Sequence, residues 1–401
     1  MVILELIFAL FILSLPSAEI IRFQYSNGVA ISLNDILLGI LVFYWLIYRI
    51  KNKKLSLRND RLLKPIFIFP AIGLIALVVN FTDLKLSEFF VSFLYLLRWV
   101  MYALIYFIVR DLSKQFKGKI PYLLFISGSI IVFGGYIQYF LYPNLRNLYY
   151  LGWDEHLYRM FSSFLDPNFA GAFFVLFFML TVGLVYSFLK KKAFIKSFVF
   201  SVMGLLTFIA VYLTYSRSAL ITLIIATAVF LFIIGRRKVI VLSVIALLLI
   251  VFLLPRSFQT EGTNFLRVAS GEARIQSLQL GFNIFAKNPV LGVGFDAYRY
   301  AQNRYGIISG QDWQTTHSGA GTDNSFLFVL ATTGVIGFAA FIYLLFCLFR
   351  LAKENFKTNM LSVVLFSSLA GLIFDSFFIN SLFYVFIMEW VWVLLGLIES
   401  K

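Results

Sequence analysis

Charged residues are scarce in this chain: Asp, Glu, Lys and Arg make up only 13% of its 401 residues, against roughly 25% in soluble globular domains. Hydrophobic residues make up 61%, and apolar runs recur along nearly the whole length. Each run is close to the roughly 20 residues that a helix needs to cross the hydrocarbon core of a bilayer. The shortage of charge therefore excludes an ordinary soluble domain and predicts an integral membrane protein.

Cysteine and histidine are also scarce. The single cysteine, Cys347, lies inside an apolar run, which excludes an internal disulfide and a cysteine-based metal cluster. Two histidines, His156 and His317, are too few for a histidine-based metal site. No Walker loop, Rossmann fingerprint or HExxH motif occurs. We therefore expect neither a metal nor a cofactor. The isoelectric point of 9.7 is high, but the basic residues follow a membrane topology, which argues against a nucleic acid partner.

The apolar runs predict an all-α polytopic membrane protein. Helix is the expected state because lipid offers the backbone no hydrogen-bond partners, and the alternation typical of a membrane barrel is absent. We expect one integral membrane domain over 1–401, with about 12 transmembrane helices and one large external loop between helices 9 and 10. The predicted spans are 2–18, 32–49, 65–81, 89–109, 120–141, 166–188, 196–213, 218–234, 238–254, 324–349, 359–379 and 381–398.

The first run could instead be a signal peptide, because residues 14–18 loosely resemble a cleavage site. It lacks a basic stretch at its start, and it carries the acidic residue Glu5. A membrane span is therefore the favoured interpretation of residues 2–18.

The distribution of lysine and arginine predicts the orientation, because cytoplasmic loops carry the excess of both residues. Basic-rich loops alternate with basic-poor loops, the longest of which is 255–323. We therefore expect both termini in the cytoplasm and the 255–323 loop on the outer side of the membrane. Of the 34 basic residues, 22 lie at Lys401 and in the loops near 49–64, 110–119, 190–196, 236–238 and 350–357.

The two sets of basic residues differ in type. The cytoplasmic set has 15 Lys and 7 Arg, whereas the external set has 10 Arg and 2 Lys. Arginine offers a planar fork of donors suited to phosphate or carboxylate, so its external excess predicts an anionic substrate. Ordinary surface arginines, enriched by chance, are the alternative. The external arginines are Arg22, Arg98, Arg146, Arg159, Arg217, Arg256, Arg267, Arg274, Arg299 and Arg304.

The 255–323 loop is the only sizeable part predicted outside the membrane. Within it, residues 273–286 predict an amphipathic helix. Arg274 would lie in its first turn, and the Asn-Pro pair at 288–289 would end it. We expect this helix to lie on the membrane surface. Its apolar face is formed by Ile275, Leu278, Phe282 and Phe285.

Residues 216–218 read Ser-Arg-Ser between two apolar runs. Either Ser216 or Ser218 can cap the following helix, which places Arg217 in its first turn. The helix dipole already favours an anion at that position. The motif therefore predicts a binding site for a lipid diphosphate. A tight hairpin whose arginine only reaches up to the headgroups is the alternative.

Asp323 and Asn324 end the external loop. Asp323 could cap the tenth span, or it could act as a general base that accepts a hydroxyl proton; the sequence leaves both open. His317 is the second candidate base, with a solvated surface histidine as the alternative. Gly334 and Gly337 follow within the span and are expected to allow close helix packing.

Polar residues within the spans complete the candidates. Asp166 can cap the sixth span, with a proline at the first helical position. Asn168 then lies just inside the membrane, where a polar substrate groove or another helix would satisfy its amide. Arg98, Asp375 and Glu389 also lie within spans, so each should be paired or face a polar cavity. We expect Arg98 and Glu389 to form a structural ion pair.

Taken together, these features resemble the O-antigen ligase and polymerase superfamily of bacterial membrane glycosyltransferases. The resemblance covers about 160–401 and rests on Asp-Pro-Asn at 166–168, Ser-Arg-Ser at 216–218, the arginine-bearing loop helix and Asn-Pro-Val-Leu-Gly-Val-Gly at 288–294. Twelve spans with a large external loop between the ninth and tenth are also the family's layout. In ligases a histidine precedes the tenth span; the corresponding residue here is Asp323, which suits a polymerase or another polysaccharide ligase better.

The resemblance implies transfer or polymerisation of glycan from an undecaprenyl diphosphate-linked donor onto the hydroxyl of an acceptor glycan or lipid. The implied location is the periplasmic or extracellular face of the bacterial inner (cytoplasmic) membrane, among membrane lipids and other polysaccharide-assembly proteins. Arg217 and Arg274 would bind the diphosphate and stabilise charge as the bond breaks, with Asp323 or His317 as the base. The expected substrate-binding residues are Asn168, Arg267, Arg299 and Asn324.

Two other classes of function remain as alternatives. A transporter or flippase of the same lipid-linked oligosaccharide should line a path through most of the membrane with charge, whereas the charges here concentrate at one face. A structural scaffold explains the placement of the arginines least well.

Overall fold

The computed structural model describes residues 1–24, 29–53, 60–236, 238–240, 261–264, 269–309, 313 and 319–399. These residues are almost entirely helical, apart from a short antiparallel hairpin of β1 (Arg22–Gln24) and β2 (Ala30–Ser32), in which Phe23 pairs with Ile31. The helices are α1 (Val2–Ser14), α2 (Leu33–Lys51), α3 (Leu63–Val79), α4 (Leu86–Asp111), α5 (Lys114–Lys117), α6 (Ile120–Leu141), α7 (Pro167–Lys190), α8 (Phe194–Leu213), α9 (Arg217–Ile233), α11 (Ala269–Lys287), α12 (Tyr298–Arg304), α13 (Ser325–Glu354), α14 (Met360–Asp375) and α15 (Val385–Ile398).

The predicted spans coincide with helices wherever the structure describes them. Within the described residues, six helices of 18 residues or more are apolar enough to cross a membrane, and α1, α3, α9, α14 and α15 are shorter apolar helices of the same bundle. The chain is therefore an all-α, multi-pass membrane protein. Most of the predicted span at 238–254 lies outside the described residues, so the number of twelve spans stays a prediction.

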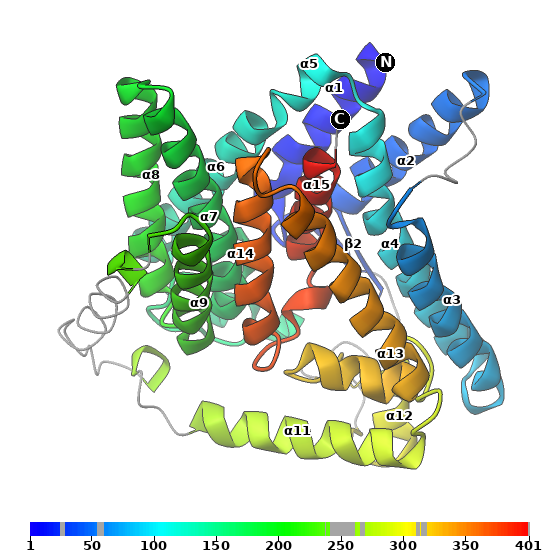
Figure 1. Cartoon of the computed structure of the whole chain (residues 1–401). Coiled ribbons are helices and arrows are strands. Elements are labelled where there is room, and N and C mark those ends of the chain that lie inside the picture. The colour runs from blue at the N-terminus through cyan, green and yellow to red at the C-terminus, as the bar shows by residue number, and fades with distance from the viewer. Residues whose placement is uncertain are drawn as a thin grey trace.

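Ion pairs show that three of the predicted cytoplasmic loops, near 49–64, 110–119 and 350–357, meet at one end of the bundle. Arg49 at the end of α2 donates to Asp111 at the end of α4 over 2.7 Å. Arg61, just before α3, pairs with Glu354 at the end of α13. Both chain termini lie at this end of the molecule (Figure 1).

The opposite end of the bundle carries the hairpin and the described part of the loop that is predicted to be external. There the backbone amide of Glu19 donates to the carbonyl of Ser163 over 3.0 Å, and the guanidinium of Arg304 donates to the carbonyl of Asp83 over 2.8 Å. Helix α11 lies across this end, roughly perpendicular to the spans (Figure 1). A helix is present where residues 273–286 predict one. It is longer than predicted, so that Arg274 lies in its second turn.

The faces of α11 differ from the prediction. Gly281 and Ile284 are buried against the bundle. By contrast, the predicted apolar residues Ile275, Leu278 and Phe282 are exposed. The packed face therefore lies beside the predicted apolar stripe, and the stripe itself points away from the protein.

Helix α13 is broken at Gly334, which has φ 65° and ψ −169°. The loop at 289–294 fills the break: the amides of Val293 and Gly294 donate to the carbonyls of residues 331 and 332, and the amide of Val335 donates to the carbonyl of Pro289. This explains the Asn-Pro-Val-Leu-Gly-Val-Gly motif, whose backbone satisfies the groups that the break exposes. The expectation that Gly334 serves close packing between helices is wrong, because its role is to break its own helix.

Replacing Gly334 with alanine is expected to destabilise the protein by about 1–3 kcal/mol or more, because only glycine adopts this backbone conformation readily. A Cβ atom there would also lie 2.2 Å from the carbonyl of Val290. Thermal unfolding of the detergent-solubilised protein measures the effect. Gly39→Ala is the matched control, since an added Cβ atom at Gly39 would have no neighbour within 4 Å. Equal melting temperatures for the two variants would contradict this role of Gly334.

The expected ion pair between Arg98 and Glu389 does not form. Arg98 instead makes a two-pronged salt bridge with Asp35, over 2.8 Å and 2.6 Å. Glu389 accepts a hydrogen bond from the amide of Asn34 over 2.7 Å. Both partners lie at the start of α2, which a Ser32–Asp35 capping box defines. The prediction failed because these partners are 63 and 355 positions away in sequence and could not be identified as neighbours.

Candidate functional site

The Ser-Arg-Ser motif forms the start of α9, as predicted. Ser216 is the N-cap residue and accepts a hydrogen bond from the amide of Ala219 over 3.5 Å. Tyr215 before it has φ 51°, a left-handed conformation that turns the chain sharply from α8 into α9. Arg217 is therefore the first residue of the helix, where unpaired amide groups and the helix dipole favour an anion.

A buried polar network holds this turn in place. The hydroxyl of Ser216 donates to the amide oxygen of Asn168 at the start of α7 over 3.0 Å. Arg159, which is buried, donates to the same oxygen over 3.2 Å and to the carbonyl of Thr214 over 2.9 Å. The predicted substrate-binding residue Asn168 thus fixes the position of the α8–α9 turn. The anchoring role of Arg159 was missed, because the sequence shows it only as one external arginine among ten.

Helix α7 begins at the same end of the bundle. Asp166 caps it, as predicted, by accepting from the amides of Asn168 over 2.6 Å and Phe169 over 3.2 Å. Pro167 occupies the first helical position. The starts of α7 and α9 therefore lie side by side, joined through Asn168.

The start of α13 corrects one interpretation of the sequence. Its N-cap is Asn324, whose side chain accepts from the amide of Leu327 over 2.9 Å and donates to the carbonyl of Phe377 over 3.2 Å. Asp323 is therefore not the cap, and its exposed side chain is available for another role. The backbone amide of Asp323 donates to the hydroxyl of Ser277 on α11 over 3.1 Å, which ties it to the loop helix.

Helix α11 places Arg274 over the starts of the other helices. The guanidinium lies 5.9 Å from the centre of the Phe378 ring. Burial lowers the pKa of Arg274, nearby Asp323 opposes this shift, and the positive charge of Arg217 adds to it. An arginine remains protonated at neutral pH in spite of such shifts. The guanidinium groups of Arg217 on α9 and Arg274 on α11 are thus close enough to interact electrostatically.

Both acidic and basic side chains lie near the carboxyl group of Asp323. Although the side chain reaches solvent, the helices packed around it remove part of the water from the carboxyl group, which raises its pKa. The charge of Arg274 opposes this shift, and the carboxylates of Asp166 and Asp154 reinforce it. A raised carboxyl pKa brings the group closer to the range in which a general base works at neutral pH.

The structure adds Asp375, at the end of α14, to the candidates. Its side chain is 0% exposed. The hydroxyl groups of Ser218, Thr222 and Ser381 surround it, and Arg274 is within electrostatic range. A buried carboxylate is costly unless a positive charge offsets it. The guanidinium of Arg274 supplies such a charge, a relation that sequence spacing could not show.

Of the other predicted site residues, one lies elsewhere and two cannot be placed. Arg299, on α12, belongs to a second charged group, in which Asp296, Tyr95 and Arg22 are its electrostatic neighbours. Arg267 and His317 lie outside the described residues.

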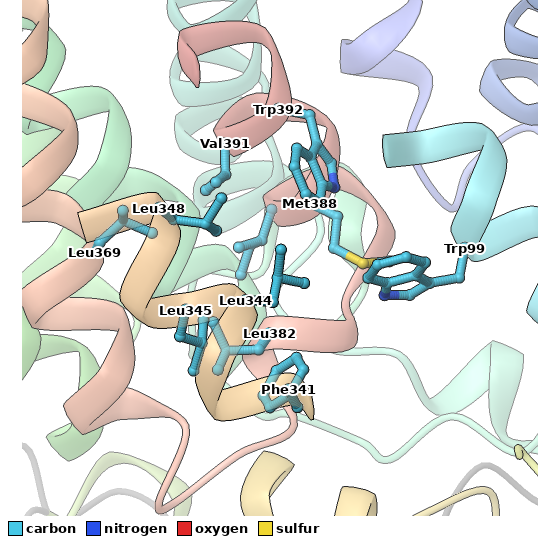
Figure 2. Close-up of a pocket in the computed structure, with 11 residues that line it drawn as sticks. Trp99, Phe341, Leu344, Leu345, Leu348, Leu369, Leu382, Met388, Val391 and Trp392 are labelled. Atoms are coloured by element: carbon cyan, nitrogen blue, oxygen red, sulfur yellow. The ribbon is translucent and has the colours of Figure 1, made fainter. Parts of the chain in front are cut away.

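A small apolar pocket of about 40 Å³ lies elsewhere, between α4, α13, α14 and α15. Figure 2 shows Trp99, Met388 and Trp392 around it, with leucines of α13 on the other side. The residues that line it are all hydrophobic, so it offers no group for acid–base chemistry. The candidate site is the charged end of the bundle and not this pocket.

The arrangement is suited to binding a multiply charged anion. Two arginines converge with the starts of three helices, α7, α9 and α13, each of which contributes roughly half a positive charge. The carboxyl group of Asp323, whose pKa is raised, lies near Arg274. Among the described residues, no group of three or more His, Cys, Asp or Glu side chains is placed to hold a metal ion.

Part of the candidate site lies within a segment that matches a known family model. Residues 202–342 match the family model described as O-antigen ligase. The match confirms the resemblance found in the sequence. It includes Arg217, Arg274 and Asp323, whereas Asp166, Asn168 and Asp375 lie beyond its ends. No curated protein matches the chain.

Proposed function

We propose that the chain, a multi-pass membrane protein that belongs to the O-antigen ligase and polymerase superfamily, polymerises surface polysaccharide from repeats carried on undecaprenyl diphosphate. The observation that carries the proposal is the convergence of Arg217 and Arg274 at the starts of three helices. A diphosphate at a lipid surface is the anion that such a site fits.

In this mechanism the two guanidinium groups bind the diphosphate of the donor. The bond between the sugar carbon and the diphosphate oxygen breaks, and the leaving lipid diphosphate gains negative charge. Donors positioned in advance stabilise that charge where it develops. Because the leaving group is already activated, the reaction proceeds without a metal ion or a nucleotide sugar.

The acceptor hydroxyl attacks the sugar carbon from the side opposite the diphosphate, which inverts the configuration. The proton of the acceptor hydroxyl passes to the carboxylate of Asp323, which lies within electrostatic range of Arg274. His317 remains the second candidate for this role. The buried carboxylate of Asp375 offsets part of the positive charge of Arg274 when no substrate is bound.

Polymerisation is favoured over ligation onto lipid A-core because Asp323 stands where the ligases of the family have a histidine. The alternative is a flippase for the same lipid-linked glycan. The charged residues of the candidate site argue against it, since they gather at one end of the bundle and line no path through it.

Deleting the gene tests this proposal. For a polymerase, single repeats on their lipid carrier are expected to accumulate on the outer face, while polymer is lost. Accumulation of long polymer on the carrier would indicate a ligase instead. Accumulation of single repeats on the cytoplasmic face would indicate a flippase and would reject a transferase.

We expect the candidate site to face the periplasm or the cell exterior. In a Cys347→Ser background, cysteines introduced at Asn264 and Gly310 should react with an impermeant thiol reagent in intact spheroplasts. A cysteine at Lys357, at the other end of the bundle, should react only after permeabilisation. The reverse pattern would place the site in the cytoplasm and reject this topology.

A further inference from the structure

A groove of about 280 Å³ lies near the external end of the bundle, between the end of α1, helix α6 and the loop at 161–165. This is just below the roughly 300–1,000 Å³ of small-molecule pockets. Most of its lining is apolar, including Ile20, Ile130 and Gly134. The function proposed above does not use it.

The groove opens onto the lipid-facing surface. Ile20 is 66% exposed and Ile130 is 49% exposed. Their apolar surface continues along α6 through Phe133 and Ile137, which are also exposed. In a membrane protein such a continuous apolar surface contacts hydrocarbon chains. The groove is therefore continuous with the surface that faces the bilayer.

The length of the groove is close to the thickness of the hydrocarbon layer of one leaflet. The lining residues on and just after α6 run from Ile130 to Tyr142. At a rise of 1.5 Å per residue this is roughly 18 Å, while half of a hydrocarbon core of roughly 30 Å is about 15 Å. A single chain entering from the outer leaflet would occupy the groove along its length.

The polar end of the groove is rigid and carries an unpaired hydroxyl. The side chain of Gln138 accepts from the amides of Phe161 and Ser162 over 2.8 Å and 3.1 Å, and donates to the carbonyl of Tyr142 over 3.0 Å. Ser163, which also lines the groove, is buried, and its hydroxyl has no hydrogen-bond partner among the described residues. A polar headgroup at this end would meet a preformed wall.

The loop that forms this wall leads directly into the start of α7. Residues 161–165 line the groove, and the next residues, Asp166 and Asn168, form the start of α7. Asn168 contacts Ser216, the cap of α9 beside Arg217. A lipid in the groove and a diphosphate at Arg217 would therefore both lie near the segment 161–168.

We propose that this groove holds the polyprenyl chain of the acceptor lipid, so that donor and acceptor are both bound near the start of α7. The proposal rests on the polymerase function, because chain growth needs two lipid-linked glycans at once. The test must distinguish a polyprenyl chain in this groove from an ordinary phospholipid.

Photolabelling of the purified full chain in nanodiscs tests the groove directly. One probe is a polyprenyl phosphate with a diazirine near its phosphate end, and the other is a phosphatidylglycerol with a diazirine in its acyl chain. The polyprenyl probe is expected to label peptides that contain 130–142 and 161–165. Excess unlabelled polyprenyl phosphate should abolish this labelling, whereas excess phosphatidylglycerol should leave it unchanged.

Gly134→Leu fills the groove, since a Cβ atom there would meet only the Ser162 hydroxyl, at 3.8 Å. It is expected to reduce polyprenyl labelling at least fivefold and to raise the KM for acceptor lipid. Gly39→Leu, on α2, where no atom lies within 4 Å of an added Cβ, is the control and should label like the parent. Benzophenone incorporated at Ile130 gives a second readout that does not depend on the folding of the Gly134 variant.

Equal labelling by both probes, without competition by polyprenyl phosphate, would overturn the proposal and indicate an ordinary membrane lipid. Unchanged labelling of Gly134→Leu would overturn it as well. Specific polyprenyl labelling in a protein that forms no glycosidic bond would uphold a lipid site in the groove and reject the polymerase function separately.

Discussion

Replacing Arg217 with lysine is expected to reduce polymer formation almost as far as replacing it with alanine, by about 100-fold or more. Arg217 is the first residue of α9, and Ser216 and Asn168 fix the turn before it. A guanidinium can donate two parallel hydrogen bonds to a diphosphate, whereas an ammonium acts as a point charge. Polymer length and amount on gels, at equal protein level, measure the effect.

Arg304→Lys is the matched control for Arg217→Lys, because Arg304 lies at the same end of the bundle and donates to the carbonyl of Asp83. It should polymerise like the parent. Normal polymer from Arg217→Lys would show that the fork of donors is not required there. Arg274→Lys is expected to resemble Arg217→Lys, unless the neighbouring Arg267 is the true ligand.

Replacing Asp323 with asparagine is expected to lower turnover by about 100- to 10,000-fold, the usual contribution of a general base. The variant keeps the size of the side chain but cannot accept the acceptor's proton. Donor binding and the melting temperature should hardly change, because Asn324 and not Asp323 caps α13. Single-turnover assays and thermal unfolding of the purified protein measure the two effects.

The pH profile gives a second readout for Asp323. Partial loss of solvent around the carboxyl group raises the pKa of Asp323 above its ordinary value. A base must be deprotonated to work, so activity should fall as the pH drops through this raised pKa. The acid limb should therefore lie above the pH range in which an ordinary aspartate titrates, and it should disappear in residual Asp323→Asn activity.

His317→Gln is the control for Asp323→Asn. If His317→Gln is inactive while Asp323→Asn retains full activity, the base is His317, and the alignment of Asp323 with the ligase histidine is wrong. If both variants keep full activity, neither residue accepts the proton of the acceptor hydroxyl. Asp375→Asn would then be the next variant to test.

Local signals in the sequence were enough for much of the fold. The spans follow from apolar runs, because lipid leaves the backbone no state other than helix. The caps Asp166 and Ser216 follow from side chains that bond to amides two or three residues ahead. At the start of α13, Asp323 and Asn324 are both good cap residues in adjacent positions, and only the three-dimensional structure selects Asn324.

Long-range relations could not be predicted in this way. Arg98 pairs with Asp35, and not with Glu389, because the start of α2 packs beside α4. The break at Gly334 depends on a loop some forty residues earlier that supplies its hydrogen bonds. The positions of Arg159 and Asp375 around the motif likewise depend on how α7, α9 and α14 pack together.

Transfer of glycan from one lipid diphosphate to another, at this charged end of the bundle, can be measured with purified protein in proteoliposomes. The protein is supplied with a radiolabelled repeat unit on undecaprenyl diphosphate, in the presence of EDTA. We expect one undecaprenyl diphosphate to be released for each glycosidic bond formed, with growth of the chain. Movement of the intact lipid-linked repeat between leaflets, with no diphosphate released, would contradict a transferase.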